Sequence, residues 1–448
     1  MERKKAADKP MKKGFTTGSC AAAASAAAAR MLFTGEEISS ISIETPAGEI
    51  FTPQINYVNL RKECFASCAV LKDGGDDPDV TTGLYIFSRV SIEGEGVEEE
   101  NGVMSTQVPG ENDPGIMSTI KEGRRLEAEP ELMSTSVEKT QKNRGLKPDL
   151  IMSTNLDTAH ANEGIRVVID GGEGIGRVTR PGLDRRVGEA AINSVPRGMI
   201  EEAVRLEALK AGFKGLIKVM ISAPGGERVA EKTFNPRLGI VGGISILGTS
   251  GVENPMSMQA IIDTIEVEMR VHKAAGEEVI AVTPGNYGQE YMLKEYGYDL
   301  EMSVKCSNFI GNAIELASKL GFKAMLLTGH IGKLIKLAGG ITNTHSLYGD
   351  CRMELLCAAA LRAGCSADTA RAVLQSISTD EALRHIKGAG LIERTMENVL
   401  ERVMDTLRNK AKGDMEMECI IYSNVFGRLA HSSGAAGLLD SIRRQGIS

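Results

Sequence analysis

Hydrophobic and polar positions near the start of the chain predict one helix followed by four strands. The run from Ser19 to Phe33 consists almost wholly of alanine and other strong helix formers, and Thr and Ser precede it at cap-like positions, which predicts a helix. From Ile41 to Val90 the pattern favours β-structure. Two strands flank a Pro-Ala-Gly turn, and two more flank an acidic, glycine-rich loop. An α+β domain is therefore expected at the N-terminus.

The stretch from residue 93 to residue 163 shows neither the helical nor the strand spacing of hydrophobic positions. It is rich in Glu, Gly, Pro and Asn, and it contains Met-Ser-Thr at four irregularly spaced positions, beginning at Met104, Met117, Met133 and Met152. Solenoid repeats need a fixed period, so the pattern indicates a polar, mobile insertion rather than a repeat array.

The second half of the chain repeats a strand, a glycine-rich loop and a helical pattern three times. The strand-like segments IVGGISIL, EEVIAVTP and FKAMLLTG are followed by Gly248–Gly251, Gly285–Gly288 and His330–Lys333 respectively. This order is typical of an α/β domain with a mostly parallel sheet. Beyond Asp350 helical periodicity dominates, which predicts C-terminal helices and one last strand.

Length and composition add a domain count and exclude several classes of protein. The chain has 448 residues, more than one hydrophobic core usually supports, so we expect two domains, residues 1–230 and 231–448. With 42% hydrophobic and 25% charged residues, the composition is that of a globular protein rather than a disordered or collagen-like one. The formal net charge of −7 argues against a nucleic-acid partner, because such a protein would present positive charge to phosphates.

Cysteine usage and hydropathy bear on the cellular compartment. The eight cysteines form no CxxC pair and show no disulfide-framework spacing, which is typical of reduced thiols. No window approaches the apolar length of a membrane-spanning helix, and the N-terminus lacks a signal-peptide core. We therefore expect a cytoplasmic protein without a membrane partner.

The three glycine-rich loops are the first candidates for a ligand site. Ligands of open α/β sheets bind beyond the carboxyl ends of the strands, where a missing Cβ lets them reach the backbone. The alternative is that these glycines only permit tight turns. No G-x-G-x-x-G follows the first strand and GHIGK is too short for a P-loop, so a nucleoside without pyrophosphate, such as S-adenosylmethionine, is compatible. The candidate cofactor-binding residues are Gly248, Thr249, Ser250, Gly251, Gly285, Asn286, Gly288 and Gly329.

An acidic loop and two histidines supply candidates for proton transfer. The segment KDGGDDPDVT carries four aspartates, a density that could bind a cation or raise the pKa of a carboxyl group. A solvated turn explains the spacing better than either role, and the EF-hand pattern is not followed, so no metal site is predicted. His330 in a strand-end loop and His345 in ITNTHS are the best-placed histidines, although a lone histidine more often has only a structural role.

Five long segments together resemble one family, the cobalt-precorrin-5B (C1)-methyltransferases of anaerobic cobalamin biosynthesis. The segments are GFTTGSCAAAA (Gly14–Ala24), KDGGDDPDVTTG (Lys72–Gly83), IDGGEGIGRVTRPGL (Ile169–Leu183), FNPRLGIVGGISILGTSGVENPMS (Phe234–Ser257) and GHIGKLIKLAGGITNTHS (Gly329–Ser346). The resemblance implies methyl transfer from S-adenosylmethionine to carbon 1 of cobalt-precorrin-5B, a cobalt-bound tetrapyrrole, to give cobalt-precorrin-6A. It also implies that the N-terminal α+β domain is followed by a Rossmann-like, three-layer α/β domain with C-terminal helices.

The implied substrate directs attention to cations within the matched segments. The ring carries many carboxylates, so its site should offer Arg, Lys and backbone N–H groups. The expected substrate-binding residues are Thr16, Thr17, Ser19, Arg177, Arg180, Lys333 and His345, with Arg185, Arg186 and Lys336 beside them. Transfer of a methyl group requires no protein nucleophile. Asp76, Asp77 and His330 are the candidates for a general base, and cobalt enters with the substrate, so no protein-bound metal is expected.

Two other functions stay open at the level of sequence. A nucleotide-dependent oxidoreductase would use the same glycine-rich loops, although the missing dinucleotide fingerprint argues against it. A non-catalytic tetrapyrrole-binding protein would bind through the same residues. The oligomeric state is also open, with a homodimer as one option.

Overall fold

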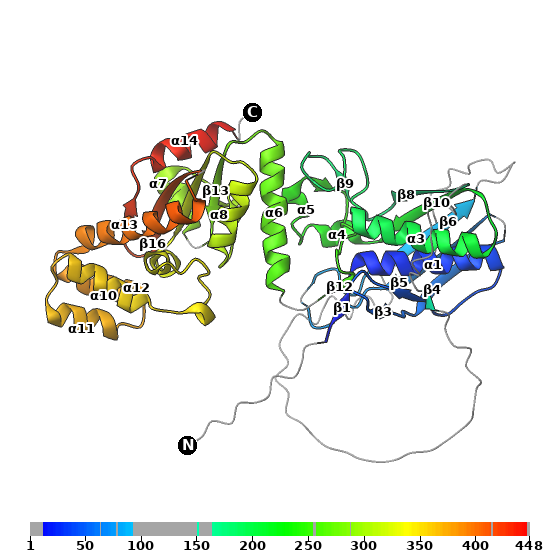
Figure 1. Cartoon of the computed structure of the whole chain (residues 1–448), viewed down its shortest axis with the longest axis horizontal. Coiled ribbons are helices and arrows are strands. Elements are labelled where there is room, and N and C mark those ends of the chain that lie inside the picture. The colour runs from blue at the N-terminus through cyan, green and yellow to red at the C-terminus, as the bar shows by residue number, and fades with distance from the viewer. Residues whose placement is uncertain are drawn as a thin grey trace, which may run out of the picture. The chain divides into compact units, whose positions relative to one another are not determined.

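The chain divides into two compact units (Figure 1). The structure, a computed structural model, describes residues 12–62, 64–77, 79–92, 150–151, 164–253, 257–286, 288–413 and 415–445. Unit 1 comprises Met1–Thr179 and Asp184–Met256, and unit 2 comprises Arg180–Leu183 and Ser257–Ser448. The insertion that the sequence predicts at residues 93–163 lies outside the described residues, apart from 150–151.

The division between the units differs from the domain boundary that the sequence predicts after residue 230. Residues 231–253 continue unit 1 because two short strands in this segment pair with strands of that unit. β11 (Ile240–Val241) pairs with β9 (Arg177–Val178), and β12 (Val252–Glu253) pairs with β1 (Gly14–Phe15).

Unit 1 contains a five-stranded sheet. Its strands are, in sheet order, β4 (Ile55–Arg61), β5 (Phe65–Leu71), β6 (Tyr85–Ile92), β10 (Gly215–Ser222) and β8 (Ile165–Gly171). Neighbours pair antiparallel except β10 and β8, which are parallel. Beside this sheet, β2 (Ser42–Glu44) pairs antiparallel with β3 (Ile50–Phe51) and parallel with β7 (Leu150–Ile151). The two hairpins predicted from the turn signals, β2–β3 and β5–β6, are confirmed.

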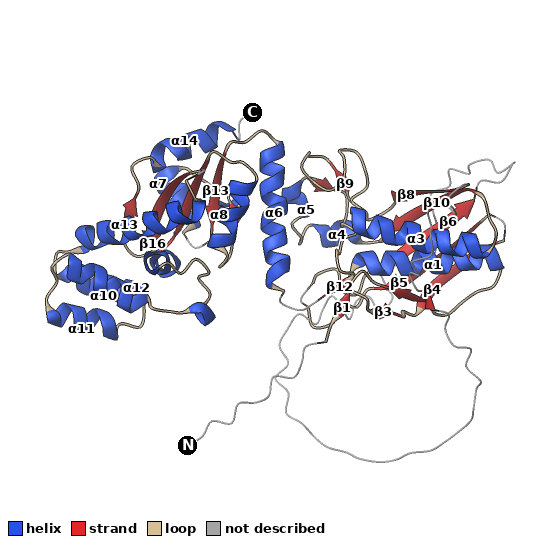
Figure 2. Ribbon diagram, in the orientation of Figure 1, coloured by secondary structure: helices blue, strands red, loops and turns tan. Residues whose placement is uncertain are grey.

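Two helices pack together against the unit 1 sheet, α1 (Thr17–Thr34) and α3 (Ser194–Lys210) (Figure 2). Thr16 caps α1 because its hydroxyl accepts a hydrogen bond from the Ser19 backbone N–H. The alanines of α1 are buried on every side, since their small side chains let α3 and the sheet approach closely. The predicted alanine-rich helix is confirmed.

Unit 2 contains a second five-stranded sheet with helices on both faces. Its strands are, in sheet order, β14 (Val304–Lys305), β13 (Val279–Thr283), β15 (Ala324–His330), β16 (Glu416–Ser423) and β17 (Gly427–His431). The first four are parallel and β17 is antiparallel. Alternate strand residues enter two hydrophobic cores, of which one includes α8 (Ile310–Lys319) and α13 (Ile392–Ala411), and the other α7 (Gln289–Tyr296) and α14 (Ala435–Gln445). The mixed α/β architecture predicted for the chain is confirmed.

The remaining helices are short in unit 1 and more extensive in unit 2. They are α4 (Gly226–Ala230), α5 (Asn235–Leu238), α6 (Met258–Ala274), α9 (Ile331–Leu334), α10 (Arg352–Arg362), α11 (Ala367–Gln375) and α12 (Thr379–Gly388), with 3-10 turns η1 (Leu300–Met302), η2 (Ile335–Gly339) and η3 (Ser346–Tyr348). The C-terminal helices predicted beyond Asp350 are therefore present. Within the described ranges, no helix combines the length and apolar character that crossing a membrane requires.

The first of the three predicted strand, loop and helix repeats is not part of the parallel sheet. The segment IVGGISIL forms only β11 and isolated bridges at Ile244 and Ile246, all within unit 1. Its glycine pair explains the difference, because a Cβ on Gly243 would lie 2.2 Å from the Gly174 carbonyl oxygen, so the chain passes another backbone closely here. The prediction of three equivalent loops at one sheet edge is wrong, and β13 and β15 account for the other two.

Candidate functional site

The connectivity of the unit 2 sheet points to a ligand site at one edge. The chain runs from β13 to β14 on one side, and then through α8 to β15 on the other side of β13. In such sheets a crevice forms beyond the carboxyl ends of the two strands where the connections change direction. Those strands are β13, which is followed by Pro284 and Gly285, and β15, which ends at His330.

Lys333 links the strand ends at this edge. It lies in α9, directly after β15, and its Nζ donates to the carbonyl oxygens of Pro284 after β13 and Ser307 after β14, both at 3.3 Å. Burial lowers the pKa of Lys333, and the neighbouring Lys336 ammonium acts in the same direction. The site therefore has a half-buried cation at the point where three parallel strands end.

A cavity of about 280 Å³ lies beside Lys333. It is lined by residues that follow β14 and β15 and by the loop before α10, namely Asn308, Gly332, Lys333, Lys336, Thr344, His345, Ser346, Asp350 and Arg352. Lys333 and His345, two of the predicted substrate-binding residues, are thus brought together. Asn308 and Arg352 carry no motif signal and are found only from the fold.

The loop after β13 has open backbone. A Cβ added to Gly285 would meet none of the described heavy atoms within 4 Å. The Thr283 hydroxyl donates to the Gly285 carbonyl oxygen at 3.0 Å, and the exposed Asn286 donates from Nδ2 to Glu301 Oε1 at 2.7 Å. This loop can present backbone groups to a ligand, and the Glu301 carboxylate of η1 lies beside it.

Two other glycines at this edge face the protein itself. A Cβ on Gly288 would lie 2.0 Å from the Tyr422 ring, and one on Gly329 would lie 2.9 Å from Leu334. These positions require glycine because neighbouring side chains approach them closely. Their predicted contact with a cofactor stays a prediction, but packing alone already explains the residue type.

The predicted residues around the start of α1 are also brought together, in unit 1. Ser19 Oγ donates to the Gly251 carbonyl oxygen at 2.6 Å, and Thr17 Oγ1 accepts from the Leu247 backbone N–H at 3.0 Å. A Cβ on Gly248 would lie 2.4 Å from Thr16 Oγ1. Hydroxyls and glycines therefore hold the start of α1 against the segment 247–251. Thr249 and Ser250 lie between Gly248 and Gly251 in that segment.

The acidic loop after β5 contains a buried charge network. Lys72 is only 1% exposed, and its Nζ donates to Asp79 Oδ2 at 2.7 Å and to Glu253 Oε2 at 3.0 Å. Burial raises the pKa of Glu253 to about 7 in spite of the Lys72 ammonium. Of the predicted bases, Asp76 is exposed, and Asp77 is half-buried with a pKa raised by burial and by the charge of Asp79. Sequence reasoning missed Glu253, which lies in a distant segment.

The two predicted histidines each cap a short helix. His330 Nδ1 accepts a hydrogen bond from the Gly332 backbone N–H at 3.0 Å, and burial lowers the pKa of this histidine. Because an accepting ring nitrogen carries no proton, the neutral His330 ring holds its proton on Nε2. The exposed His345 likewise accepts from the Leu347 N–H at 3.2 Å.

The predicted arginines differ in their surroundings. Arg177 forms a two-pronged pair with Asp170, at 2.7 Å and 3.1 Å, and also donates to the Gly171 carbonyl oxygen at 2.7 Å. Its guanidinium is thus engaged at the end of β8. Arg180 is exposed and lies in the short segment that groups with unit 2.

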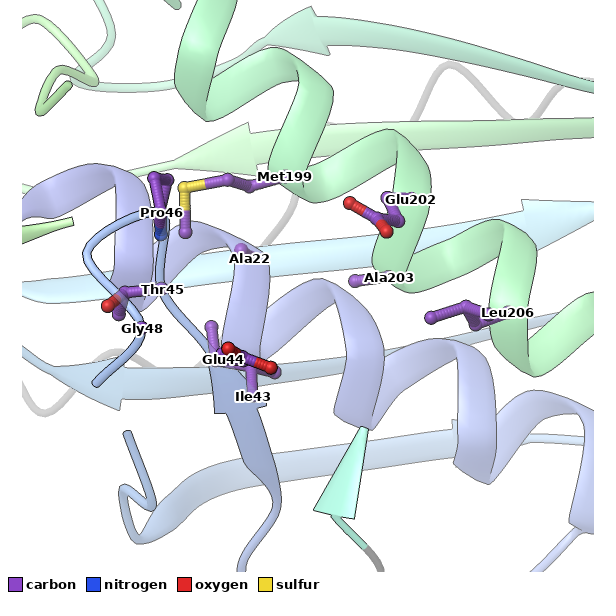
Figure 3. A pocket seen from close by; sticks show the side chains of 10 residues that line it. All are labelled: Ala22, Ile43, Glu44, Thr45, Pro46, Gly48, Met199, Glu202, Ala203 and Leu206. Carbon is purple, nitrogen blue, oxygen red and sulfur yellow. The ribbon is translucent and has the colours of Figure 1, made fainter. Parts of the chain in front are cut away.

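Unit 1 has a cavity of its own, of about 360 Å³ (Figure 3). Met199, Glu202 and Leu206 reach it from α3, and Ile43 and Glu44 from β2. The charged groups in its lining are the two carboxylates, which would repel an anionic ligand. In the described part of the chain, no group of three or more His, Cys, Asp or Glu residues is arranged to hold a metal ion.

Comparison with known proteins identifies the family. A family model described as CbiD matches residues 4–114 and 107–255, and one described as CbiD, C-terminal domain, matches residues 343–433. A protein of Ruminiclostridium cellulolyticum named cobalt-precorrin-5B C(1)-methyltransferase is 38% identical over 442 residues, which cover 98% of this chain and 97% of that relative. A Thermoanaerobacter relative of the same name is 40% identical over 384 residues, 86% of this chain and 84% of the relative.

A solved structure is also similar in part. It is a cobalamin biosynthesis protein (cbiD) from Archaeoglobus fulgidus, 22% identical, with a TM-score of 0.33 over 73% of this chain and 80% of that one. The family models and the curated relatives carry the assignment without it. This chain belongs to the CbiD family.

Proposed function

We propose that this chain transfers a methyl group from S-adenosylmethionine to carbon 1 of cobalt-precorrin-5B, giving cobalt-precorrin-6A. The observation that carries the proposal is the 38% identity, over 98% of the chain, to a relative named for this reaction. No feature of the described residues favours the oxidoreductase or the non-catalytic binding protein over it. A cytoplasmic location and a homodimer stay predictions from the sequence.

The chemistry requires alignment more than it requires reactive side chains. S-adenosylmethionine supplies a methyl group activated by its sulfonium, which departs as a thioether when the ring carbon attacks in line. The protein contributes by holding the two reactants in register and by excluding water, effects that lower barriers by several kcal/mol in comparable reactions. Binding residues should therefore matter more than any single catalytic group.

We place the methyl donor at the β13–β15 edge of unit 2. A sheet with four parallel strands and helices on both faces suits a Rossmann-like domain, in which nucleosides bind beyond the carboxyl ends of the strands at this position. Gly285 offers open backbone, and Glu301, held by Asn286, offers a carboxylate that can accept from ribose hydroxyls. Among the predicted cofactor-binding residues, Gly285 and Asn286 are the ones we assign to direct contact.

His330 lies at the same edge but suits a different role from the general base that the sequence predicts. Its Nδ1 already accepts the Gly332 N–H, and its lowered pKa keeps the ring neutral near pH 7. A neutral ring of this tautomer can donate a hydrogen bond from Nε2, whereas the lone pair of Nδ1, where a proton would be taken up, is engaged by the Gly332 N–H. We therefore assign His330 a donor role toward a bound ligand.

The test is the reaction itself. Purified protein is incubated with cobalt-precorrin-5B and S-adenosylmethionine labelled with ¹³C in the methyl group, and the corrinoid is analysed by mass spectrometry and NMR. We expect the corrinoid to gain one labelled methyl group at carbon 1. The Ruminiclostridium cellulolyticum relative serves as the positive control, and no gain under conditions where that relative methylates the ring would overturn the proposal.

A further inference from the structure

The unit 2 cavity combines a small volume with an excess of positive charge. Lys333, Lys336 and Arg352 line it, and Asp350 is the carboxylate among the lining residues. At about 280 Å³ the cavity lies at the lower limit of small-molecule pockets, so it suits one arm of a large ligand rather than a whole ring. Both properties point to a subsite for an anionic side chain.

Lys336 is the most informative of these cations because it is buried. It is 4% exposed, and its Nζ donates to the carbonyl oxygens of Thr344 at 3.0 Å and Gly349 at 2.9 Å. The Asp350 carboxylate is 3.9 Å from Nζ and is itself 57% exposed. Carbonyl oxygens satisfy N–H donors but bring no countercharge, and burying a charge without one is costly.

Asp350 is further weakened as a partner because it is shared. Its oxygens accept hydrogen bonds from the Arg352 guanidinium, one of them at 3.0 Å. One exposed carboxylate thus faces two cations, while Lys333 Nζ contacts two carbonyl oxygens at 3.3 Å and no carboxylate among the described residues. An anion within the cavity would supply the charge that the described residues lack.

Asn308 adds a neutral donor to this lining. Its Oδ1 accepts a hydrogen bond from Thr344 Oγ1 at 3.1 Å, which orients the amide so that its N–H groups can donate to a ligand. Two ammonium groups, a guanidinium and an amide are the set of donors that binds a carboxylate well.

We propose that this cavity binds one carboxylate side chain of the tetrapyrrole substrate, with Lys333 and Lys336 as its main contacts. The proposal rests on the proposed function, which supplies a ring with acidic arms. The amino-acid end of S-adenosylmethionine also carries a carboxylate, but an ammonium group lies beside it, and three cations would repel that group. The acidic arms of the ring carry no positive charge, so the cavity favours them.

Binding of two corrinoids that differ in charge tests the subsite. Cobyrinic acid has free acid side chains, whereas cobinamide carries amides in their place, and both are titrated into the full-length protein by calorimetry. We expect Lys333→Gln and Lys336→Gln each to weaken cobyrinic acid binding about tenfold and to leave cobinamide binding unchanged. Lys319→Gln is the matched control, since Lys319 is an exposed lysine on α8 and is 71% exposed.

The test does not depend on Lys336→Gln alone, since a substitution at this buried position can prevent folding. Thermal unfolding of each variant shows whether it is folded, and if Lys336→Gln is not, Lys333→Gln and Arg352→Gln decide the question. Unchanged cobyrinic acid binding in folded variants overturns the proposal, and so does an equal loss for cobinamide, because that would indicate damage to the ring site as a whole.

A second pair of probes separates the ring from the methyl donor as the source of the carboxylate. S-adenosylhomocysteine and its decarboxylated analogue are titrated into wild type and Lys333→Gln. Loss of affinity for the first and not for the second would overturn the ring assignment in favour of the donor, whereas no change in either supports the ring.

The two proposals can fail separately. Wild-type protein that does not methylate cobalt-precorrin-5B, but whose cobyrinic acid binding depends on Lys333, would overturn the function and keep the subsite. Wild-type protein that does methylate the ring, but binds cobyrinic acid as tightly after Lys333→Gln and Lys336→Gln, would overturn the subsite and keep the function.

Discussion

Two buried lysines, one in each unit, show that the same side chain is used in two ways. Lys72 in unit 1 is 1% exposed and is held by Asp79 at 2.7 Å and Glu253 at 3.0 Å. Lys336 in unit 2 is 4% exposed, yet its hydrogen bonds go to backbone carbonyls and the Asp350 carboxylate is 3.9 Å away. The fold supplies the countercharge of Lys72, and we infer that a ligand supplies that of Lys336.

Gly14 and Gly174 in unit 1 contrast with Gly285 in unit 2 in a similar way. In unit 1 a Cβ on Gly14 would lie 2.1 Å from the Gly74 backbone, and one on Gly174 would lie 1.8 Å from the Ala223 carbonyl oxygen. In unit 2 the space around Gly285 is open among the described atoms. Gly14 and Gly174 thus let one backbone segment pass close to another, which shows that a glycine in a glycine-rich motif need not contact a ligand.

The largest effect is expected for Gly174→Ala. Gly174 has φ +73°, where an added side chain is strained, and its Cβ would meet the Ala223 carbonyl oxygen, so we expect a loss of about 4 kcal/mol in the free energy of unfolding. Urea unfolding followed by circular dichroism measures it. Gly198→Ala in α3 is the control and should be neutral or stabilising, because no described atom lies near the new methyl group. Wild-type stability in Gly174→Ala would contradict the close-packed account of unit 1.

Lys72→Met is expected to cost about 3 kcal/mol, because it leaves the half-buried Asp79 and Glu253 without their shared cation. Adding Glu253→Gln in the same chain removes one of the stranded charges and should recover about 1 kcal/mol. Urea unfolding of the single and double variants gives both numbers. A double variant that is less stable than the single one would contradict repulsion between the Glu253 and Asp79 carboxylates in the absence of Lys72.

The raised pKa of Glu253 predicts a pH dependence. A carboxyl group with a folded-state pKa of about 7 favours folding while it is protonated, and this contribution is lost as pH rises from its ordinary value of 4.5 through about 7. We compare the free energies of unfolding of wild type and Glu253→Gln. After allowance for solvent screening, we expect the wild-type value, relative to that of the variant, to fall by about 1–2 kcal/mol across that range. Unfolding free energies of both proteins at several pH values test this, and a constant difference would count against it.

Lys336→Met should have the smallest effect on stability in the absence of ligand, about 1 kcal/mol. The substitution removes two hydrogen bonds to carbonyl oxygens but leaves no tightly paired carboxylate behind, in contrast to Lys72→Met. Urea unfolding compares the two directly. A loss of stability as large as that of Lys72→Met would mean that the fold itself supplies the countercharge of Lys336 and that no ligand is needed for it.

Local patterns predicted much of the fold. The alanine-rich helix α1 and the hairpins β2–β3 and β5–β6 follow from capping, periodicity and turn residues close together in sequence. Such local rules mispredicted the segment IVGGISIL. Its apolar pattern favours a strand of the parallel sheet, but the close approach of Gly243 to Gly174 places it in unit 1. That contact joins residues far apart in the chain, which single-sequence patterns do not register.

The candidate site was predictable only in part. Lys333, Lys336 and His345 lie in one matched segment and were expected at a site, but Arg352 and Asn308 join them only through the fold. Glu253 lies 181 residues from Lys72, so nothing local signals that they pair. Sequence thus identifies the chemistry-bearing motifs, whereas burial and pairing decide which of their charges are left for a ligand.

The most direct test of this account is the stabilisation that cobyrinic acid gives to three proteins, measured as the rise in melting temperature at saturating ligand. We predict that wild type and, provided it folds, Lys72→Met gain stability from the ligand, because their Lys336 receives its countercharge. Lys336→Met should gain much less. An equal gain in wild type and Lys336→Met would contradict the claim that a substrate carboxylate completes the buried charge of Lys336.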